Sequence, residues 1–384
     1  MFMLLVKKMI NKDYRLSIYI GKFILKKFLL CLIIVVLLVS KCVCLDNTSR
    51  NIEDVTNSNI SSDLPTIDDI TEYSEKMSWW KDCEDIGCFF YDEVVLSKRQ
   101  ITIAVIDAGI SESMLYNNKI YTNVKEIANN NKDDDGNGFI DDINGWNFVD
   151  NNNDVSNNNK NSVHSTAIMG LLIGEDRKDA YYGLLNDYNV KIVPIKSLND
   201  NTLDGSIDSV IDAIKYAESI QADIVALSFS TFVKSQELEN TMKNSKMLFV
   251  VAAGNGGRKL EENYMVYPAC FKLDNIITVT ALGQDGYIDE LSNYGEAYVD
   301  VAAPGIDIIC YLDNKKYVME NGTSFSVPFV VYEASILNCI SENKLSPKET
   351  KNIICGSASK NNDNLTHSGT INISKAIDSL QKMD

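Results

Sequence analysis

Four short motifs place a carboxylate, an imidazole, an amide and a hydroxyl at strand ends or helix starts. Asp107 ends the apolar run ITIAVID, and His164 opens the apolar segment HSTAIMG. Asn255 follows a second apolar run in VAAGNGG, and Ser324 leads into a third in NGTSFSVP. A serine oxygen attacks a carbonyl when an imidazole accepts its proton and a carboxylate orients that imidazole. An Asn amide can donate to the oxyanion that forms, so the four side chains predict acyl transfer.

Each motif taken alone also fits an ordinary structural role. Asp107 could end a strand, Asn255 could form an Asn-Gly turn, and Ser324 could be a helix N-cap. His164 at a helix start suits a base that must stay neutral, because the helix dipole disfavours a cation there. The chain contains one other histidine, His367, which lies in a polar segment and receives no role. The order Asp, His, Asn, Ser along one chain favours a shared catalytic site.

The segments between the motifs predict the elements that must position them. β-branched apolar runs stand at 101–107, 190–196, 222–228, 247–253 and 276–281, and helical periodicity stands at 206–220, 234–243, 324–340, 347–355 and 373–381. Apolar strands that alternate with helices predict an α/β fold of three layers, with a mainly parallel sheet and helices on both faces. In such sheets the active site lies beyond the carboxyl ends of the strands.

The four motifs and their contexts resemble those of the subtilisin-like serine peptidases, the subtilase family. Similar stretches also stand at DIVALSFS, YPA (267–269), LSNYG and VDVAAPG, so the resemblance covers roughly residues 98–380. It implies a subtilisin-like endopeptidase in which Ser324 attacks the scissile carbonyl, His164 carries the proton and Asp107 orients the imidazole. Asn255 and the backbone N–H of Ser324 would hold the oxyanion. The residues implied for substrate binding are Ser228, Phe229, Ser230 and Gly205.

The chain departs from the family pattern around these residues. Ala108 stands where the family prefers Ser or Thr, and Ser165 stands where it prefers Gly. Phe325-Ser326-Val327 replaces the usual Met-Ala-Ala, and Ser230 stands near an expected Gly, where its side chain would narrow the S1 entrance. All four chemical groups remain, so we expect an active enzyme of altered specificity. The alternative is a catalytically impaired relative that binds peptides or serves as a calcium-stabilised surface protein.

A second motif, DDDGNGFID at 133–141, has the oxygen spacing of a calcium loop. The implied ligands are the side chains of Asp133, Asp135, Asn137 and Asp141 and the carbonyl of Phe139. The twelfth position is Asn144 in place of a bidentate Glu, so we expect a weaker site or one completed from elsewhere in the chain. An acidic surface turn is the alternative interpretation.

The N-terminal 44 residues read as a targeting segment. A basic region precedes an uncharged apolar run at 28–39, which predicts a signal peptide, or a signal anchor if it is retained. A run of this length is short for a membrane span, which needs roughly 20 residues. The protein is therefore expected to be secreted, or anchored in the membrane outside the cytoplasm. Residues 45–97 are predicted as a polar pro-segment, linker and N-terminal extension, and 98–384 as the peptidase domain.

The charge of the chain constrains its partners. Its 384 residues carry a net charge of −17, and the part after residue 44 carries −24, with 28 basic and 52 acidic residues. Such a balance argues against a nucleic-acid surface and suits a basic peptide substrate. We expect a monomer that acts on peptides or proteins, and a narrower resemblance is to peptidases that trim leader peptides from modified bacterial peptides. Cys83 and Cys88 are close enough to close a local loop, whereas Cys339 and Cys355 are expected to be buried free thiols.

Overall fold

The computed structural model describes residues 51–52, 79–81, 99–157, 163–174, 183–312, 316–360 and 365–383. The leader predicted at 1–44, most of the segment at 45–97 and the cysteines Cys83 and Cys88 lie outside these residues. The described part contains the four motifs and the elements predicted to position them. Cys339 and Cys355 are free thiols as expected, the first buried and the second half-buried.

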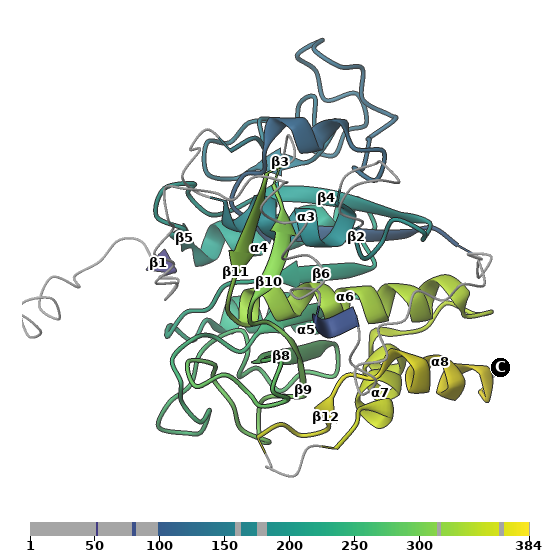
Figure 1. Cartoon of the computed structure of the whole chain (residues 1–384). Helices are drawn as coiled ribbons and strands as arrows, with labels where there is room; N and C mark the ends of the chain where they lie inside the picture. Colours follow the sequence, from purple (N-terminus) through teal and green to yellow (C-terminus); the bar gives the residue numbers. More distant parts are fainter. Residues whose placement is uncertain are drawn as a thin grey trace, which may run out of the picture. The chain divides into compact units, whose positions relative to one another are not determined.

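Eight parallel strands form one sheet in the order β12-β9-β8-β7-β6-β2-β4-β3 (Figure 1). The strands are β2 (Ile101–Asp107), β3 (Trp146–Asn147), β4 (Val190–Lys196), β6 (Ile224–Leu227), β7 (Leu248–Ala252), β8 (Ile276–Leu282), β9 (Val301–Pro304) and β12 (Gly369–Thr370). The central strands are apolar along their whole length because helices cover both faces of the sheet. The five predicted strands are all present, with ends that differ by at most two residues.

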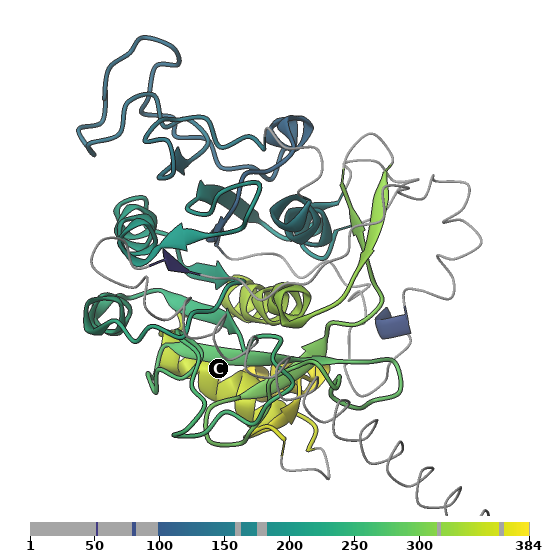
Figure 2. The same ribbon diagram turned by 90° about the vertical axis from the view of Figure 1, so that its left-hand side faces the viewer.

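Helices cover both faces of the sheet and make the three predicted layers (Figure 2). One face carries α3 (His164–Ile173), α6 (Thr323–Ile340), α7 (Pro347–Ser357) and α8 (Ile373–Gln381), and the other carries α4 (Ile207–Ser219) and α5 (Gln236–Asn244). The surface helices begin at side-chain caps that satisfy free N–H groups: Ser206 caps α4, and Ser346 with Glu349 forms a capping box at α7. The buried side chains form one apolar cluster on each face.

The helix that carries the serine motif, α6, runs through the core. All 18 of its residues are buried, and it packs against β6, β7, β8 and β9. A helix that is apolar all round is typical of such a position. Among the described residues it is the one helix long and apolar enough to cross a membrane, and its complete burial in the core accounts for that composition.

Two short antiparallel pairs lie outside the main sheet. The strands β10 (Ile308–Tyr311) and β11 (Tyr317–Glu320) form a hairpin, and β1 (Asn51–Ile52) pairs with β5 (Gly205–Ser206). The sequence did not predict these strands, since runs of two to four residues carry little periodicity.

Two tryptophans from the N-terminal extension pack into the core of the domain. They belong to the short helix η1 (Trp79–Lys81). The indole N–H of Trp79 donates to the carbonyl of Ile306 at 3.0 Å, and the ring of Trp80 lies edge-on to Phe329 of α6 at 5.0 Å. These contacts tie the extension to the helix that carries Ser324.

One carboxyl group is buried in the core without a hydrogen-bond partner among the described residues. Glu333 of α6 is fully buried, and neither of its carboxylate oxygens has a hydrogen-bond partner among the described residues. Burial alone raises the pKa of Glu333 to about 8. The side chain is therefore mainly neutral at pH 7, and ionising it in place would leave an unpaired charge in the core.

Glu333 is expected to make the stability of the folded chain decline as the pH rises. The pKa of Glu333 is about 8 in the folded state, above its ordinary value of 4.5. Its contribution to the free energy of unfolding is therefore fully present below the ordinary pKa and is lost as the pH rises toward the pKa of the folded state. The slope in this window is at most about 1.4 kcal/mol per pH unit. Urea unfolding measured from pH 5 to pH 8 tests this expectation.

Glu333→Gln should flatten this dependence, whereas Glu218→Gln on the exposed face of α4 should retain it. An unchanged slope in Glu333→Gln would contradict the assignment of the pH dependence to Glu333.

Candidate active site

Parallel pairing brings the motifs to one edge of the sheet. Asp107 is the last residue of β2, Ser228 directly follows β6, and Asn255 comes three residues after β7. The strands β2, β6 and β7 are immediate neighbours, and Leu227 of β6 is in register with both Ile106 and Val251. Their carboxyl ends therefore deliver these polar residues side by side.

The carboxylate of Asp107 orients the imidazole of His164. Oδ1 of Asp107 lies 3.1 Å from Nδ1 of His164 and also accepts the N–H of Ala108 at 2.7 Å. Asp107 is completely buried, and His164 is 8% exposed. With an ionised carboxylate at Nδ1, that nitrogen carries the proton and Nε2 is the basic one. This is the arrangement that a general base requires.

Two hydroxyl groups join the first turn of α3 to the turn after Asp107. Oγ of Ser165 donates to the carbonyl of Ala108 at 2.9 Å, and Oγ1 of Thr166 accepts the N–H of Ser111 at 3.0 Å. Ser165 is the residue that stands where the family prefers Gly. Its hydroxyl links the two motifs directly, next to the contact between Asp107 and His164.

A buried ion pair also holds the turn after Asp107. Nζ of Lys196 lies 2.6 Å from Oδ2 of Asp200, and Oδ1 of Asp200 accepts the N–H of Gly109 at 2.9 Å. A Cβ on Gly109 would lie 2.5 Å from the carbonyl oxygen of Ser156, so only glycine fits there. Sequence reasoning missed this pair. The sequence pointed to this ion pair only through a Lys at the end of a predicted strand and an Asp four residues later.

Ser324 occupies the second position of α6, among the free N–H groups of the helix start. Its hydroxyl donates to the carbonyl of Ser228 at 3.0 Å, and the Ser228 hydroxyl donates back to the carbonyl of Ser324 at 3.2 Å. A hydroxyl has one proton, so Ser324 must rotate away from Ser228 before it can donate to His164. The ring of Phe325 lies edge-on to the imidazole at 5.7 Å and packs against the base.

The side-chain amide of Asn255 is held with its nitrogen end available. Oδ1 of Asn255 accepts from the backbone N–H of Thr323 at 3.0 Å and from the Thr323 hydroxyl at 2.9 Å. That hydroxyl in turn accepts the N–H of Gly254 at 3.1 Å. Because Oδ1 is committed, Nδ2 is the end that can donate to an oxyanion. A Cβ on Gly322 would lie 3.1 Å from this nitrogen and crowd it.

Asn293, from the LSNYG stretch, fixes the loop that carries Asn255. Its Nδ2 donates to the carbonyl of Ala253 at 2.8 Å, and its Oδ1 accepts the N–H groups of Gly256 and Arg258 at 3.2 Å each. Asn293 is 1% exposed. The sequence analysis noted the LSNYG stretch but gave neither Asn293 nor Thr323 a role, because both contact residues far away in the chain, which no local spacing reveals.

The four residues implied for substrate binding take different places. Ser228 is buried and bonded to Ser324, while the ring of Phe229 is 1% exposed in the core, which leaves its backbone for binding. Oγ of Ser230 lies 3.3 Å from where a Cβ on Gly254 would stand, so it sits beside the Asn255 loop. Gly205 lies in β5, whose edge pairs with β1 in this structure.

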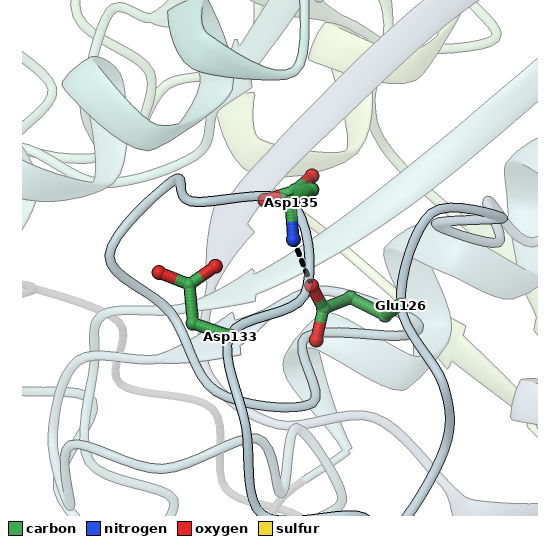
Figure 3. A group of neighbouring side chains, drawn as sticks. All are labelled: Glu126, Asp133 and Asp135. Atoms are coloured by element: carbon green, nitrogen blue, oxygen red, sulfur yellow. Dashed lines mark hydrogen bonds between the residues drawn. The ribbon is translucent and has the colours of Figure 1, made fainter.

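An acidic group forms within the loop at 126–135. Ligand oxygens of Glu126, Asp133 and Asp135 lie within 4.8 Å of one another, and Figure 3 shows the three carboxylates together. Glu126 also accepts the N–H groups of Asp134 at 2.8 Å and Asp135 at 3.0 Å. Three converging carboxylates match the hard oxygen ligands that calcium prefers. Glu126 was not anticipated, and it supplies a carboxylate that the twelfth loop position lacks.

The other implied ligands lie in the same loop with different partners. The amide of Asn137 accepts the N–H of Phe139 at 2.8 Å and donates to Asp142 at 3.0 Å. The carboxylate of Asp141 accepts the N–H groups of Asn130 at 3.2 Å and Asn131 at 2.9 Å, on the neighbouring turn. The ring of Phe139 packs edge-on to Trp146 at 5.1 Å and Tyr216 at 4.8 Å, so the loop is anchored in the core.

Comparison with known proteins identifies the family. The sequence profile of the subtilase family matches residues 98–370, which is most of the chain. The chain belongs to the subtilase family. The family resemblance stated from the motifs and the predicted three-layer fold are both confirmed.

Individual subtilases are similar over part of this chain. It is 30% identical to the thermophilic serine proteinase of Bacillus sp. (strain AK1) over 54% of its length, and 32% identical to subtilisin-like protease 1 of Plasmodium vivax over 63%. It spans 49% and 41% of those two proteins. Among solved structures, the fold is shared with a cold-adapted subtilisin-like serine proteinase (TM-score 0.56, 22% identity, 77% of this chain and 96% of that one). It is also shared with the prenylagaramide maturation protease PagA (TM-score 0.56, 20% identity, 79% of this chain and 98% of that one).

Thr323→Val should lower kcat about tenfold with little change in KM, because Oδ1 of Asn255 loses the hydroxyl that donates to it and the N–H of Gly254 loses its acceptor. Thr323→Ser keeps the hydroxyl and should retain most of the activity. In an Asn255→Ala background the Thr323→Val change should cost almost nothing further, since its effect passes through Asn255. Steady-state kinetics on one peptide substrate measures all three. Full additivity of the two losses would contradict the coupling.

Proposed function

We propose that this subtilase is a serine endopeptidase that hydrolyses peptide bonds through Asp107, His164 and Ser324, with Asn255 in the oxyanion hole. The hydrogen bond between Asp107 and His164 carries the proposal, because it leaves Nε2 as the basic nitrogen of an imidazole whose ring contacts Phe325, the residue after Ser324 on α6. Family membership supports the reaction class.

Each of these residues has its own role in the proposed reaction. Ser324 turns from the carbonyl of Ser228 toward Nε2 of His164 and attacks the scissile carbonyl carbon as its proton passes to the imidazole. Asp107 stabilises the imidazolium, and Nδ2 of Asn255 with the backbone N–H of Ser324 stabilises the oxyanion. The imidazolium then gives its proton to the leaving amine, and water repeats the sequence to release the acyl group.

The acyl side of the substrate would bind as an extended strand between 228–230 and the edge at Gly205–Ser206. The antiparallel pairing of Asn51–Ile52 with that edge supports this placement, because it shows that the edge accepts a strand. Ser230 beside the Asn255 loop would narrow the S1 entrance and favour a small residue before the scissile bond.

The location of the protein, its oligomeric state and its substrate class are also proposals. The basic and apolar leader would export the chain, either as a secreted protein or anchored to the membrane, and a monomer would suffice, since all four catalytic groups come from one chain. A processing role is one candidate substrate class, supported by the shared fold with a maturation protease. The competing function is a peptide-binding subtilase that no longer catalyses hydrolysis.

The acidic loop would hold a structural calcium ion. Glu126, Asp133 and Asp135 would be its carboxylate ligands, and the ion would offset their mutual repulsion. Since Phe139 anchors the same loop to the core cluster under α4, the ion would stabilise the segment between β2 and α3 that precedes His164.

A fluorophosphonate probe should label Ser324 covalently, and the label should be absent in Ser324→Ala. His164→Ala should abolish peptide turnover, because the described part of the chain contains no other imidazole near the site and His367 is exposed. Intact-mass analysis and peptide hydrolysis measure these outcomes. Retained peptide binding without labelling, in a chain with a native circular dichroism spectrum, would favour the non-catalytic alternative.

Calcium should raise the melting temperature of the Ser324→Ala protein, by an amount equivalent to about 2.7 kcal/mol at a hundredfold excess over the dissociation constant. Glu126→Gln and Asp133→Asn should each reduce this shift, whereas Asp212→Asn on α4, distant from the loop in sequence, should leave it unchanged. Differential scanning calorimetry with calcium, magnesium or chelator provides the comparison. Equal melting temperatures with calcium and with chelator would exclude a structural calcium ion.

A further inference from the structure

Lys196 is the last residue of β4 and stands in register with Asp107, the last residue of the neighbouring strand β2 (Figure 1). It forms an ion pair with Asp200, and the two residues are only 3% and 6% exposed. Two buried charges lose their hydration, and their attraction often does no more than offset that cost. Stability alone therefore gives no reason for a buried ion pair at this position.

The ammonium group of Lys196 contacts two separate segments of the chain. Nζ lies 2.6 Å from Oδ2 of Asp200 and donates to the carbonyl of Ser156 at 3.2 Å. Ser156 forms a parallel bridge with Ile110, three residues after Asp107. One buried cation thus joins the loop after β4 to the stretch of chain that precedes α3.

The loop after β4 also holds the backbone around Asp107. The carbonyl of Asp107 accepts the N–H groups of the two residues that follow Lys196, at 2.8 and 3.1 Å. Oδ1 of Asp200 accepts the N–H of Gly109 at 2.9 Å. The backbone is therefore fixed on both sides of Ala108.

The orientation of the Asp107 carboxylate depends on this stretch of backbone. Its Oδ1 accepts the N–H of Ala108 at 2.7 Å and lies 3.1 Å from Nδ1 of His164. Its Oδ2 is buried and has no hydrogen-bond partner among the described residues, and Ala108 has no hydroxyl to offer it. A carboxylate that is held at one oxygen takes its orientation from the backbone N–H that holds it.

We propose that Lys196 and Asp200 are positioning residues for the reaction of this site. Lys196 holds the carboxylate of Asp200, and Asp200 holds the turn after Asp107. An N–H of that turn sets the Asp107 carboxylate against the imidazole of His164. Lys196 and Asp200 act through Asp107 and not on the substrate itself. The proposal rests on the proposed peptidase function.

The test compares Lys196→Met with the double variant Lys196→Met/Asp200→Leu in the full-length protein. Lys196→Met leaves Asp200 without its cation, and kcat per site labelled by a fluorophosphonate should fall about tenfold. The acid limb of the pH–rate profile should move to lower pH, because a misplaced Asp107 stabilises the imidazolium of His164 less. The double variant removes the unpaired charge, so its melting temperature should recover while both kinetic changes remain.

Lys351→Met is the matched control. Nζ of Lys351 also contacts a carboxylate and a strand carbonyl, those of Asp300 at 2.9 Å and Ile276 at 2.6 Å, but at the amino end of β8. This variant should lower the melting temperature and keep the wild-type kcat and pH profile. Asp200→Asn retains an oxygen for the N–H of Gly109 and should lose less kcat than Asp200→Leu. This pair decides the question if the Lys196 variants do not fold, and equal kcat values in the two would then overturn the proposal.

Recovery of kcat together with the melting temperature in the double variant would overturn the proposal, because the ion pair would then serve folding alone. A loss of kcat with an unshifted acid limb would also overturn it, since Asp107 would have kept its place. A wild-type chain that the fluorophosphonate does not label would refute the peptidase function, and the positioning with it. A labelled wild type whose variants keep full kcat would refute the positioning alone.

Discussion

Parallel pairing of β2, β6 and β7 is the constraint on which the site depends. Since all three strands run in one direction, their carboxyl ends fall at one edge, and the residues that follow them meet there. Asp107, Ser228 and Asn255 owe their proximity to this register, although up to 147 residues of chain lie between them. The apolar strands can hold the register because helices bury both faces of the sheet.

The edge of the sheet sets where the site residues lie, and buried polar contacts set how their side chains are oriented. Ser165 joins the His164 helix to the Asp107 turn, Asp200 clamps that turn, and Asn293 fixes the Asn255 loop. In a site shielded from water such contacts are costly to break, because a released partner would remain unsatisfied. The same burial explains the neutral carboxyl of Glu333, which lies on the helix that presents Ser324.

Charge has two separate uses in this acidic subtilase. In the loop at 126–135, carboxylates converge closely enough to favour a divalent cation. At the edge of the sheet, the carboxylate of Asp107 is fully buried and contacts the imidazole of His164. The departures from the family pattern likewise have local effects: Phe325 packs on His164, and Ser165 ties two motifs together.

The sequence by itself determined the five central strands, the main helices and the four motifs. Each of these rests on a local pattern, such as a β-branched run before Asp107 or the helical periodicity after Ser324. The tertiary structure alone decided that Glu126 joins the acidic loop, that Asp200 holds the Gly109 turn, and that Asn293 fixes the Asn255 loop. The physical reason is that these contacts join residues from separate elements, whose meeting depends on how helices and hairpins pack and on no spacing along the chain.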